Sequence, residues 1–155
     1  MEQETESRQQ QLAKYKEELV PLLRYLPWLE KSAGTSDGSR NYSGDDMGGC
    51  GMSFPVYDGT LLSFVREAQK TSFMDRNYRY IYTRNRIKTP EDERKVIQNA
   101  GIKEWDLLCG ILSKYVLGGQ TKGTLWSEAV KERIFYLVIK KMCDIIEYWD
   151  KPMGV

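Results

Sequence analysis

Apolar residues recur along most of this chain at intervals of three and four positions, the spacing of one face of an α-helix. The first such stripe lies in a helix predicted over about residues 8–31, and Pro21 and Pro27 predict a kink or a break in it, because proline lacks an N–H donor. The stripe consists of Leu12, Tyr15, Leu19, Leu22, Leu26 and Leu29. We interpret it as packing on the protein's own core. A dimerising coiled coil is the alternative, but that structure needs about three to four clean heptads.

Capping residues predict two helices in the middle of the chain. Asp58 precedes a stretch of helical periodicity that ends near Lys70, and an aspartate at this position accepts hydrogen bonds from the free N–H groups of the first turn. Thr89 is followed by proline and two acidic residues, which favour a first helical turn, and this second stretch ends near Gly101. Residues 73–88 alternate partly like a strand, but their helical surroundings favour a helix.

Two further helices are predicted in the C-terminal third. One covers about residues 103–117 and ends at Gly118, and the other, the longest in the chain, covers about 124–150. Residues 134–139 are apolar on every side of the last helix, a pattern typical of a helix enclosed by neighbours. The sequence therefore predicts an all-α protein, a compact bundle of about five to six helices around a long C-terminal helix.

Three segments lack helical periodicity. Residues 1–11 are polar and are predicted to be a frayed leader, and residues 151–155 form a tail. Residues 32–53 are rich in glycine and serine and are predicted to be a flexible loop, and their aspartates do not have the spacing of a calcium loop. A chain of 155 residues is the size of one domain, which we place at 12–150 with this loop inside it.

Composition narrows the classes of function. The 23 basic and 22 acidic residues leave a formal charge of +1, so any binding of a polyanion must come from a local patch. The chain has no histidine, which excludes Ser–His–Asp and Cys–His catalysis and histidine ligation of metals. Its apolar runs fall far short of the roughly 20 residues that span a bilayer. Its N-terminus does not have the pattern of a secretory signal, and its three cysteines form no CxxC pair. We expect a cytoplasmic protein with no membrane association, metal or cofactor.

An enzyme is the least favoured class. Glu128 with Glu132, and Asp144 with an acid three residues later, lie about one helical turn apart, where carboxylates can hold a cation or share a proton. Lysines and arginines beside them favour a solvated face instead. Cys109 and Cys143 lie in apolar helices, where a thiol is usually inert. No catalytic residue is assigned.

One segment combines positive charge with aromatic rings. Residues 76–88 carry five cations and no acid, and tyrosines lie between the cations. The candidates are Arg76, Tyr78, Arg79, Tyr80, Tyr82, Arg84, Arg86 and Lys88. Arginine binds phosphate through paired hydrogen bonds, and tyrosine rings stack on unpaired bases, so this segment is the candidate for nucleic-acid binding. In the competing interpretation the arginines pair with acids of other helices and the tyrosines pack.

A glycine-rich turn before the last helix is a second candidate, for an anion. Backbone N–H groups that lead into a helix N-terminus bind anions. The residues are Gly118, Gly119, Thr121, Lys122, Gly123 and Thr124. The lysine precedes the final glycine and the preceding element is a helix, so the turn is not a Walker phosphate loop. A tight connection between two helices is the favoured interpretation.

Four stretches of the chain read RYLPWLE (24–30), FPVYDGTLLSF (54–64), NYRYIYTRNRI (77–87) and GILSKYVLGG (110–119), the last continuing to WSEA at 126–129. Together they resemble a bacterial family of domains of unknown function seen in Firmicutes-type genomes, over about residues 19–150. The resemblance implies a small cytoplasmic bacterial protein and brings no activity, cofactor or site residue with it. We therefore expect a non-enzymatic binding or interaction module. Its partner is another protein, a second copy of the chain or a nucleic acid.

Overall fold

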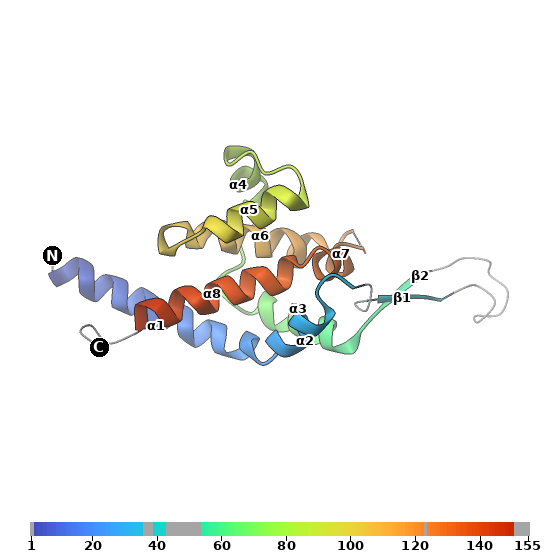
Figure 1. The fold of residues 1–155 in the computed structure, drawn as a ribbon, viewed down its shortest axis with the longest axis horizontal. Coiled ribbons are helices and arrows are strands. Elements are labelled where there is room, and N and C mark those ends of the chain that lie inside the picture. The colour runs from blue at the N-terminus through green and yellow to red at the C-terminus, as the bar shows by residue number, and fades with distance from the viewer. Residues whose placement is uncertain (1, 36–38, 43–53, 123, 151–155) are drawn as a thin grey trace.

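The computed structural model describes residues 2–35, 39–42, 54–122 and 124–150. In these ranges the chain forms eight α-helices, one short 3-10 helix and a two-stranded hairpin. The helix α8 (Ile134–Asp150) runs through the middle of the molecule, with α1 (Glu2–Leu23) on one side and α5 (Pro90–Asn99) and α6 (Trp105–Gly118) on the other (Figure 1). The predicted all-α fold is confirmed.

The prediction of a two-piece helix is confirmed, but Pro21 lies inside the first piece and does not break it. Helix α1 ends at Leu23, and α2 (Leu26–Ser32) begins with Pro27 in its first turn. The frayed leader predicted over 1–11 is wrong for residues 2–11, which are helical. The glutamate and glutamine residues there are good helix formers, and each residue added to an existing helix gains a hydrogen bond.

The leucine stripe of these two helices packs inside the chain. Leu19, Leu22 and Leu29 are fully buried, and the ring of Tyr15 stacks on Trp105 with centroids 4.4 Å apart. Helix α1 lies antiparallel to α8 (Figure 1). The structure supports the interpretation as core for Leu19, Leu22 and Leu29, and the other three residues of the stripe are partly buried.

A hairpin replaces part of the predicted flexible loop. Strands β1 (Ser39–Tyr42) and β2 (Phe54–Tyr57) pair antiparallel, and the hairpin extends from the end of the molecule opposite to the first turn of α1 (Figure 1). The loop prediction is therefore wrong at 39–42. These residues become a strand because the extended segment 54–57 offers a partner, and such long-range pairing leaves little trace in local composition. The remainder of 36–53 lies outside the described residues.

The predicted helix starts in the middle of the chain are confirmed. At the start of α3 (Gly59–Gln69) the Asp58 carboxylate accepts a hydrogen bond from the N–H of Thr60 at 2.8 Å. At the start of α5, Thr89 and Asp92 form a reciprocal capping box. Between α3 and α5 lies α4 (Tyr78–Arg84), so the ambiguous segment 73–88 does contain a helix.

The chain between α5 and α8 forms a 3-10 helix and two α-helices. A 3-10 helix η2 (Ile102–Glu104) leads into α6, and a turn after α6 leads into α7 (Leu125–Lys131). Gly118 ends α6, as predicted.

The helix predicted over 124–150 is two helices, so the prediction of one continuous helix is wrong. Arg133 has a φ of +68°, in the left-handed region, and separates α7 from α8. The carbonyl of Glu132 accepts a hydrogen bond from Nη1 of Arg94, and the carbonyl of Val130 accepts one from the N–H of Gly34. These partners from distant segments satisfy carbonyls that would otherwise continue the helix. The described chain thus has eight helices rather than five to six.

The centre of the core is the N-terminal half of α8. Ile134, Phe135, Val138 and Ile139 are fully buried, as the apolar run predicts. The ring of Phe135 packs edge-on against Phe64 of α3, with centroids 5.0 Å apart. No helix within the described ranges is long and apolar enough to cross a membrane.

Candidate functional site

Helix α4 lies at the edge of the molecule, beyond α5 and α6 as seen from α8 (Figure 1). The five cations of the candidate nucleic-acid segment are all exposed. They are Arg76, Arg79, Arg84, Arg86 and Lys88. None of the five forms an ion pair with a carboxylate that the structure describes. These five residues together with Tyr80 are called the α4 patch below.

The three tyrosines of this segment have different environments. Tyr80 is 65% exposed. Tyr82 points inward and donates a hydrogen bond to the carboxylate of Glu93. Tyr78 is half-buried, and its hydroxyl lies 3.6 Å from where a Cβ on Gly118 would be, so the two candidate segments meet at this point. Of the three predicted aromatic platforms, Tyr80 is the one that faces solvent, and Tyr82 has a packing role instead.

A buried carboxylate joins α4 to the helices beneath it. Glu93 of α5 is fully buried and accepts hydrogen bonds from the hydroxyls of Tyr82 on α4 and Tyr115 on α6, the latter at 2.6 Å. The Nζ of Lys114 lies 3.6 Å from Glu93 Oε2. A carboxylate out of water is costly unless such partners replace its hydration. We call these four residues the Glu93 anchor.

The charges in the Glu93 anchor are mutually satisfied. The Nζ of Lys114 lies 4.8 Å and 4.9 Å from the ring centroids of Tyr82 and Tyr115, within cation–π range. Burial, together with the adjacent Glu93 carboxylate, raises the pKa of Tyr82 and of Tyr115 well above that of an ordinary phenol. Both hydroxyls therefore keep their protons and continue to donate to Glu93 at neutral pH.

Close packing and a strained turn set the position of α4. Helices α4 and α6 approach closely at Gly110 of α6. A Cβ at this position would lie only 2.8 Å from Cδ1 of Ile81 on α4, so the contact requires glycine. At its C-terminus α4 ends in a Schellman turn, in which the N–H of Arg86 donates to the carbonyl of Thr83 and the next N–H to that of Tyr82. Arg86 has a φ of +55°, a conformation usually given to glycine. A strained position thus carries an exposed arginine.

The glycine-rich turn after α6 is a tight connection between helices. The N–H groups of residues 119–122 donate to carbonyls of α6, so these four donors do not face an anion. The indole of Trp126 covers Gly119 so closely that a Cβ there would lie 2.1 Å from its Nε1. Lys122 and Thr124 are exposed, and Gly123 lies outside the described residues. The geometry favours the structural interpretation of this turn.

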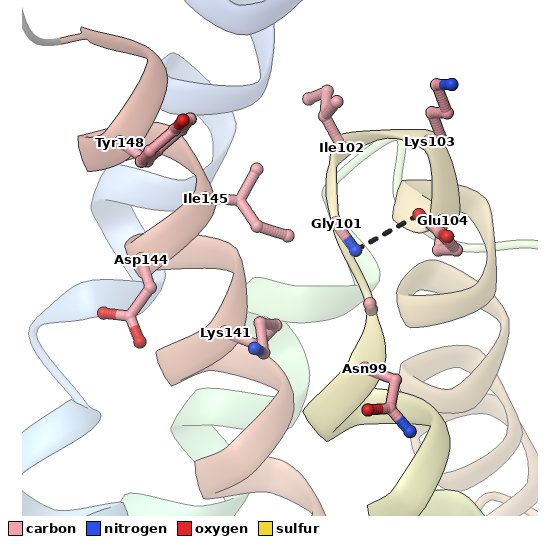
Figure 2. A pocket seen from close by; sticks show the side chains of 10 residues that line it. Asn99, Gly101, Ile102, Lys103, Glu104, Lys141, Asp144, Ile145 and Tyr148 are labelled. Atoms are coloured by element: carbon pink, nitrogen blue, oxygen red, sulfur yellow. Dashed lines mark hydrogen bonds between the residues drawn. The ribbon is translucent and has the colours of Figure 1, made fainter.

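A depression of about 490 Å³ lies between α8 and the junction of α5 with η2 (Figure 2). Figure 2 shows the Glu104 carboxylate accepting a hydrogen bond from the N–H of Gly101, at 3.1 Å. The Nζ of Lys141 donates to the carbonyl of Gln98, and Asp144 pairs with a lysine of its own helix. Binding pockets usually hold convergent polar groups that orient a ligand. Here these polar groups are committed to the protein itself.

The residues weighed for catalysis have structural partners. Glu132 pairs with Arg94 at 2.9 Å, and Asp144 pairs with Lys140 at 3.2 Å. Burial raises the pKa of the Cys109 thiol far above its usual value, which keeps the sulfur protonated and unreactive. Among the described residues, no three cysteine, aspartate or glutamate side chains gather as a possible metal site.

Sequence reasoning missed the Glu93 anchor. Glu93 precedes Ile97 by four positions and Ala100 by seven, and both are buried, so it lies on the apolar face of α5. A carboxylate on the buried face of an amphipathic helix is a visible sign of a buried polar cluster. Its partners, Lys114 and Tyr115, come from another helix and have no comparable sign.

Comparison with protein-family models, with curated proteins and with solved structures finds no match to this chain. The resemblance to a bacterial family therefore stays a prediction. The α4 patch and the Glu93 anchor that holds it are the features that bear on function.

Proposed function

We propose that this protein is a non-enzymatic binding module whose α4 patch binds a polyanion. The observation that carries the proposal is the set of five exposed cations with no carboxylate partner in the described part of the chain. Like charges that lie close together repel one another, and a bound anion relieves this repulsion.

The contacts that hold α4 against α5 and α6 support a role in recognition. In the Glu93 anchor, Tyr82 of α4 bonds to a carboxylate of α5 that two side chains of α6 also hold, and Gly110 lets α4 and α6 approach closely. A surface that is held in place before binding loses less conformational entropy when a partner arrives. The α4 patch is therefore preorganised as well as charged.

We expect this binding to depend on the local charge of the patch and to be sensitive to salt. With a formal charge of +1 the protein as a whole attracts polyanions weakly, so the affinity comes from the cations of the patch. Binding of this kind weakens steeply as salt rises, because phosphate contacts release condensed counterions.

We also propose that the protein is bacterial and cytoplasmic. The thiols of Cys109 and Cys143 are free, which suits a reducing compartment. The resemblance to a bacterial family supports the same location.

Titration with inorganic polyphosphate tests the proposal, because polyphosphate carries negative charge but has no bases. We expect the wild-type protein to bind at about 50 mM salt and to lose most of its affinity at about 200 mM. The triple variant Arg79→Gln/Arg84→Gln/Arg86→Gln is expected to bind at least about tenfold more weakly.

The matched control removes three cations from α5 and α8. These are Lys95 and Lys140, which pair with acids of their own helices, and Lys141, which donates to a carbonyl. The variant Lys95→Gln/Lys140→Gln/Lys141→Gln has the same net charge as the α4 triple variant and should stay within about twofold of the wild type. Equal weakening by the two triple variants, or no binding by the wild type at low salt, would overturn the proposal.

A further inference from the structure

We infer that the polyanion bound by the α4 patch is a single-stranded nucleic acid, with the ring of Tyr80 stacked on an unpaired base. This inference rests on the binding function proposed above and specifies its ligand. It depends on three features of the patch: an exposed ring, the cations around that ring and the type of those cations.

The ring of Tyr80 is open to solvent on a surface made mostly of charge. It is 65% exposed, whereas Tyr82, two residues later, is turned toward Glu93. An aromatic ring in water loses the free energy of burial, and α4 has an inward face that takes the other rings. The exposed face of α4 therefore combines an open stacking surface with charge.

One exposed cation lies on the same side of the helix as this ring, and another adjoins it in the sequence. Arg84 lies one helical turn after Tyr80, on the same face, and Arg79 precedes it in the chain. The phosphates of a nucleic acid lie on either side of each base, so a ring with cations beside it matches a base with its flanking phosphates. An acidic peptide would use the charges and leave the ring without a partner.

The choice of arginine also favours nucleic acid. Four of the five cations in the patch are arginines. The planar guanidinium binds phosphate through two parallel hydrogen bonds and stacks on bases, whereas lysine acts as a point charge. Arg86 occupies a left-handed position that usually takes glycine, so the chain holds this guanidinium at a strained point of the backbone.

Tyr80 can stack on an unpaired base but not on a base within a duplex. In a duplex the faces of the bases are stacked on one another and only their edges are open in the grooves. Readout of those edges favours asparagine, glutamine and arginine, whereas stacking on an exposed ring requires a splayed base. Single strands offer such bases without the cost of opening a duplex.

The test measures binding by fluorescence anisotropy at low salt for two ligands. One is single-stranded, fluorescein-labelled oligothymidine, and the other is the same strand paired with oligodeoxyadenosine in a duplex. We expect tighter binding to the single strand. Tyr80→Ala should weaken single-strand binding by roughly tenfold, and Tyr80→Phe, which keeps the ring, should bind like the wild type. The exposed position of Tyr80 allows both variants to fold, which circular dichroism checks.

Tyr148 supplies a matched control, because it is 70% exposed and lies on α8, away from the patch. Tyr148→Ala is expected to bind the oligothymidine like the wild type. Equal affinity for single strand and duplex, equal losses from the two alanine variants, or tighter binding of polyglutamate than of oligothymidine would each overturn the inference.

Polyphosphate separates this inference from the function on which it rests. Tyr80→Ala should bind polyphosphate as the wild type does, because that ligand has no base to stack. If wild-type protein binds polyphosphate but Tyr80 makes no difference to oligothymidine, the single-strand inference fails and the binding function stands. If wild-type protein binds neither ligand, both fail.

Discussion

The five cations of the α4 patch and the paired cations of α5 and α8 have different environments. On α5 and α8, Arg94 pairs with Glu132 at 2.9 Å, and Lys140 pairs with Asp144 at 3.2 Å. On α4 and its flanks, five cations are exposed and none pairs with a described carboxylate. A net charge near zero therefore includes a run of exposed cations that no described carboxylate neutralises.

The two arginines with left-handed backbones repeat this contrast. Arg133 separates α7 from α8, and its side chain, although exposed like that of Arg86, lies against the Gly34 turn, with Nε 3.2 Å from where a Cβ on Gly34 would be. Arg86 ends α4 with an exposed side chain. The same strained conformation thus serves packing in one region and, in our proposal, binding in the other.

The largest expected effect comes from removing the anchor of α4. Glu93→Ala leaves the hydroxyls of Tyr82 and Tyr115 and the ammonium of Lys114 without their acceptor. We expect the free energy of unfolding in urea to fall by about 3–5 kcal/mol. Amide hydrogen exchange should accelerate first in α4, because the anchor is its main polar attachment.

Glu91→Gln is the control for this substitution, because Glu91 lies on the same helix with its side chain 71% exposed. It should change the unfolding free energy by less than about 0.5 kcal/mol. A similarly small loss for Glu93→Ala would show that the anchor does not hold α4.

The second effect is a loss of stability at alkaline pH. Burial and the Glu93 carboxylate raise the folded-state pKa of Tyr82 and of Tyr115 above the unfolded value of about 10. The stability is therefore fully present below about pH 10 and is lost as pH rises above it, at up to about 1.4 kcal/mol per pH unit for a buried tyrosine such as Tyr115.

Urea unfolding of the wild type and of Tyr115→Phe at several pH values checks this expectation. The phenylalanine variant should be less stable at neutral pH, because Glu93 loses a donor, and its stability should fall less steeply above about pH 10. Tyr80→Phe serves as the exposed control and should follow the wild-type curve. Parallel curves for wild type and Tyr115→Phe would contradict the assigned cause.

The third effect separates stability from binding. Arg94→Gln removes the pair with Glu132 and the hydrogen bond to the Glu132 carbonyl at the end of α7. We expect the unfolding free energy to fall by about 1 kcal/mol, because the pair is half-exposed, and oligothymidine binding to stay unchanged. A loss of binding without a loss of stability would place Arg94 in the binding surface and break the contrast between the two regions.

The smallest effect is a gain. Arg86→Gly relieves the left-handed strain and is expected to raise the unfolding free energy by roughly 0.5 kcal/mol while it weakens oligothymidine binding several-fold. Arg133→Gly has the same backbone change in the region of internal packing and should leave binding unchanged. If the two variants bind oligothymidine equally well, Arg86 is not a contact.

Local chemistry explains which parts of the fold were predictable. The starts of α3 and α5 follow from Asp58 and Thr89, whose capping hydrogen bonds lie within three residues of the cap. The break at Arg133 depends on Arg94 and Gly34, which come from distant segments, and no local pattern records their presence. Strand β1 likewise forms only because β2 is brought beside it.

The candidate site was predictable in its charge but not in its details. The run of cations without an acid in 76–88 is visible in the sequence, and all five are exposed. Which tyrosine faces solvent depends on Glu93, eleven residues after Tyr82, which draws that ring inward. The absence of ion pairs within the described chain depends on where every acid of the other helices lies, which the sequence does not state.

The most direct measurement compares the binding of two variants, one of which adds a carboxylate beside the cations of α4. Thr83→Glu places a carboxylate on the exposed face of α4, one turn after Arg79, and Gln98→Glu adds the same charge to the exposed face of α5. We expect Thr83→Glu to weaken the binding of oligothymidine at low salt by about tenfold or more, and Gln98→Glu to change it by less than about twofold. Equal affinities for the two variants would contradict the claim that the unpaired cations of α4 form the binding surface.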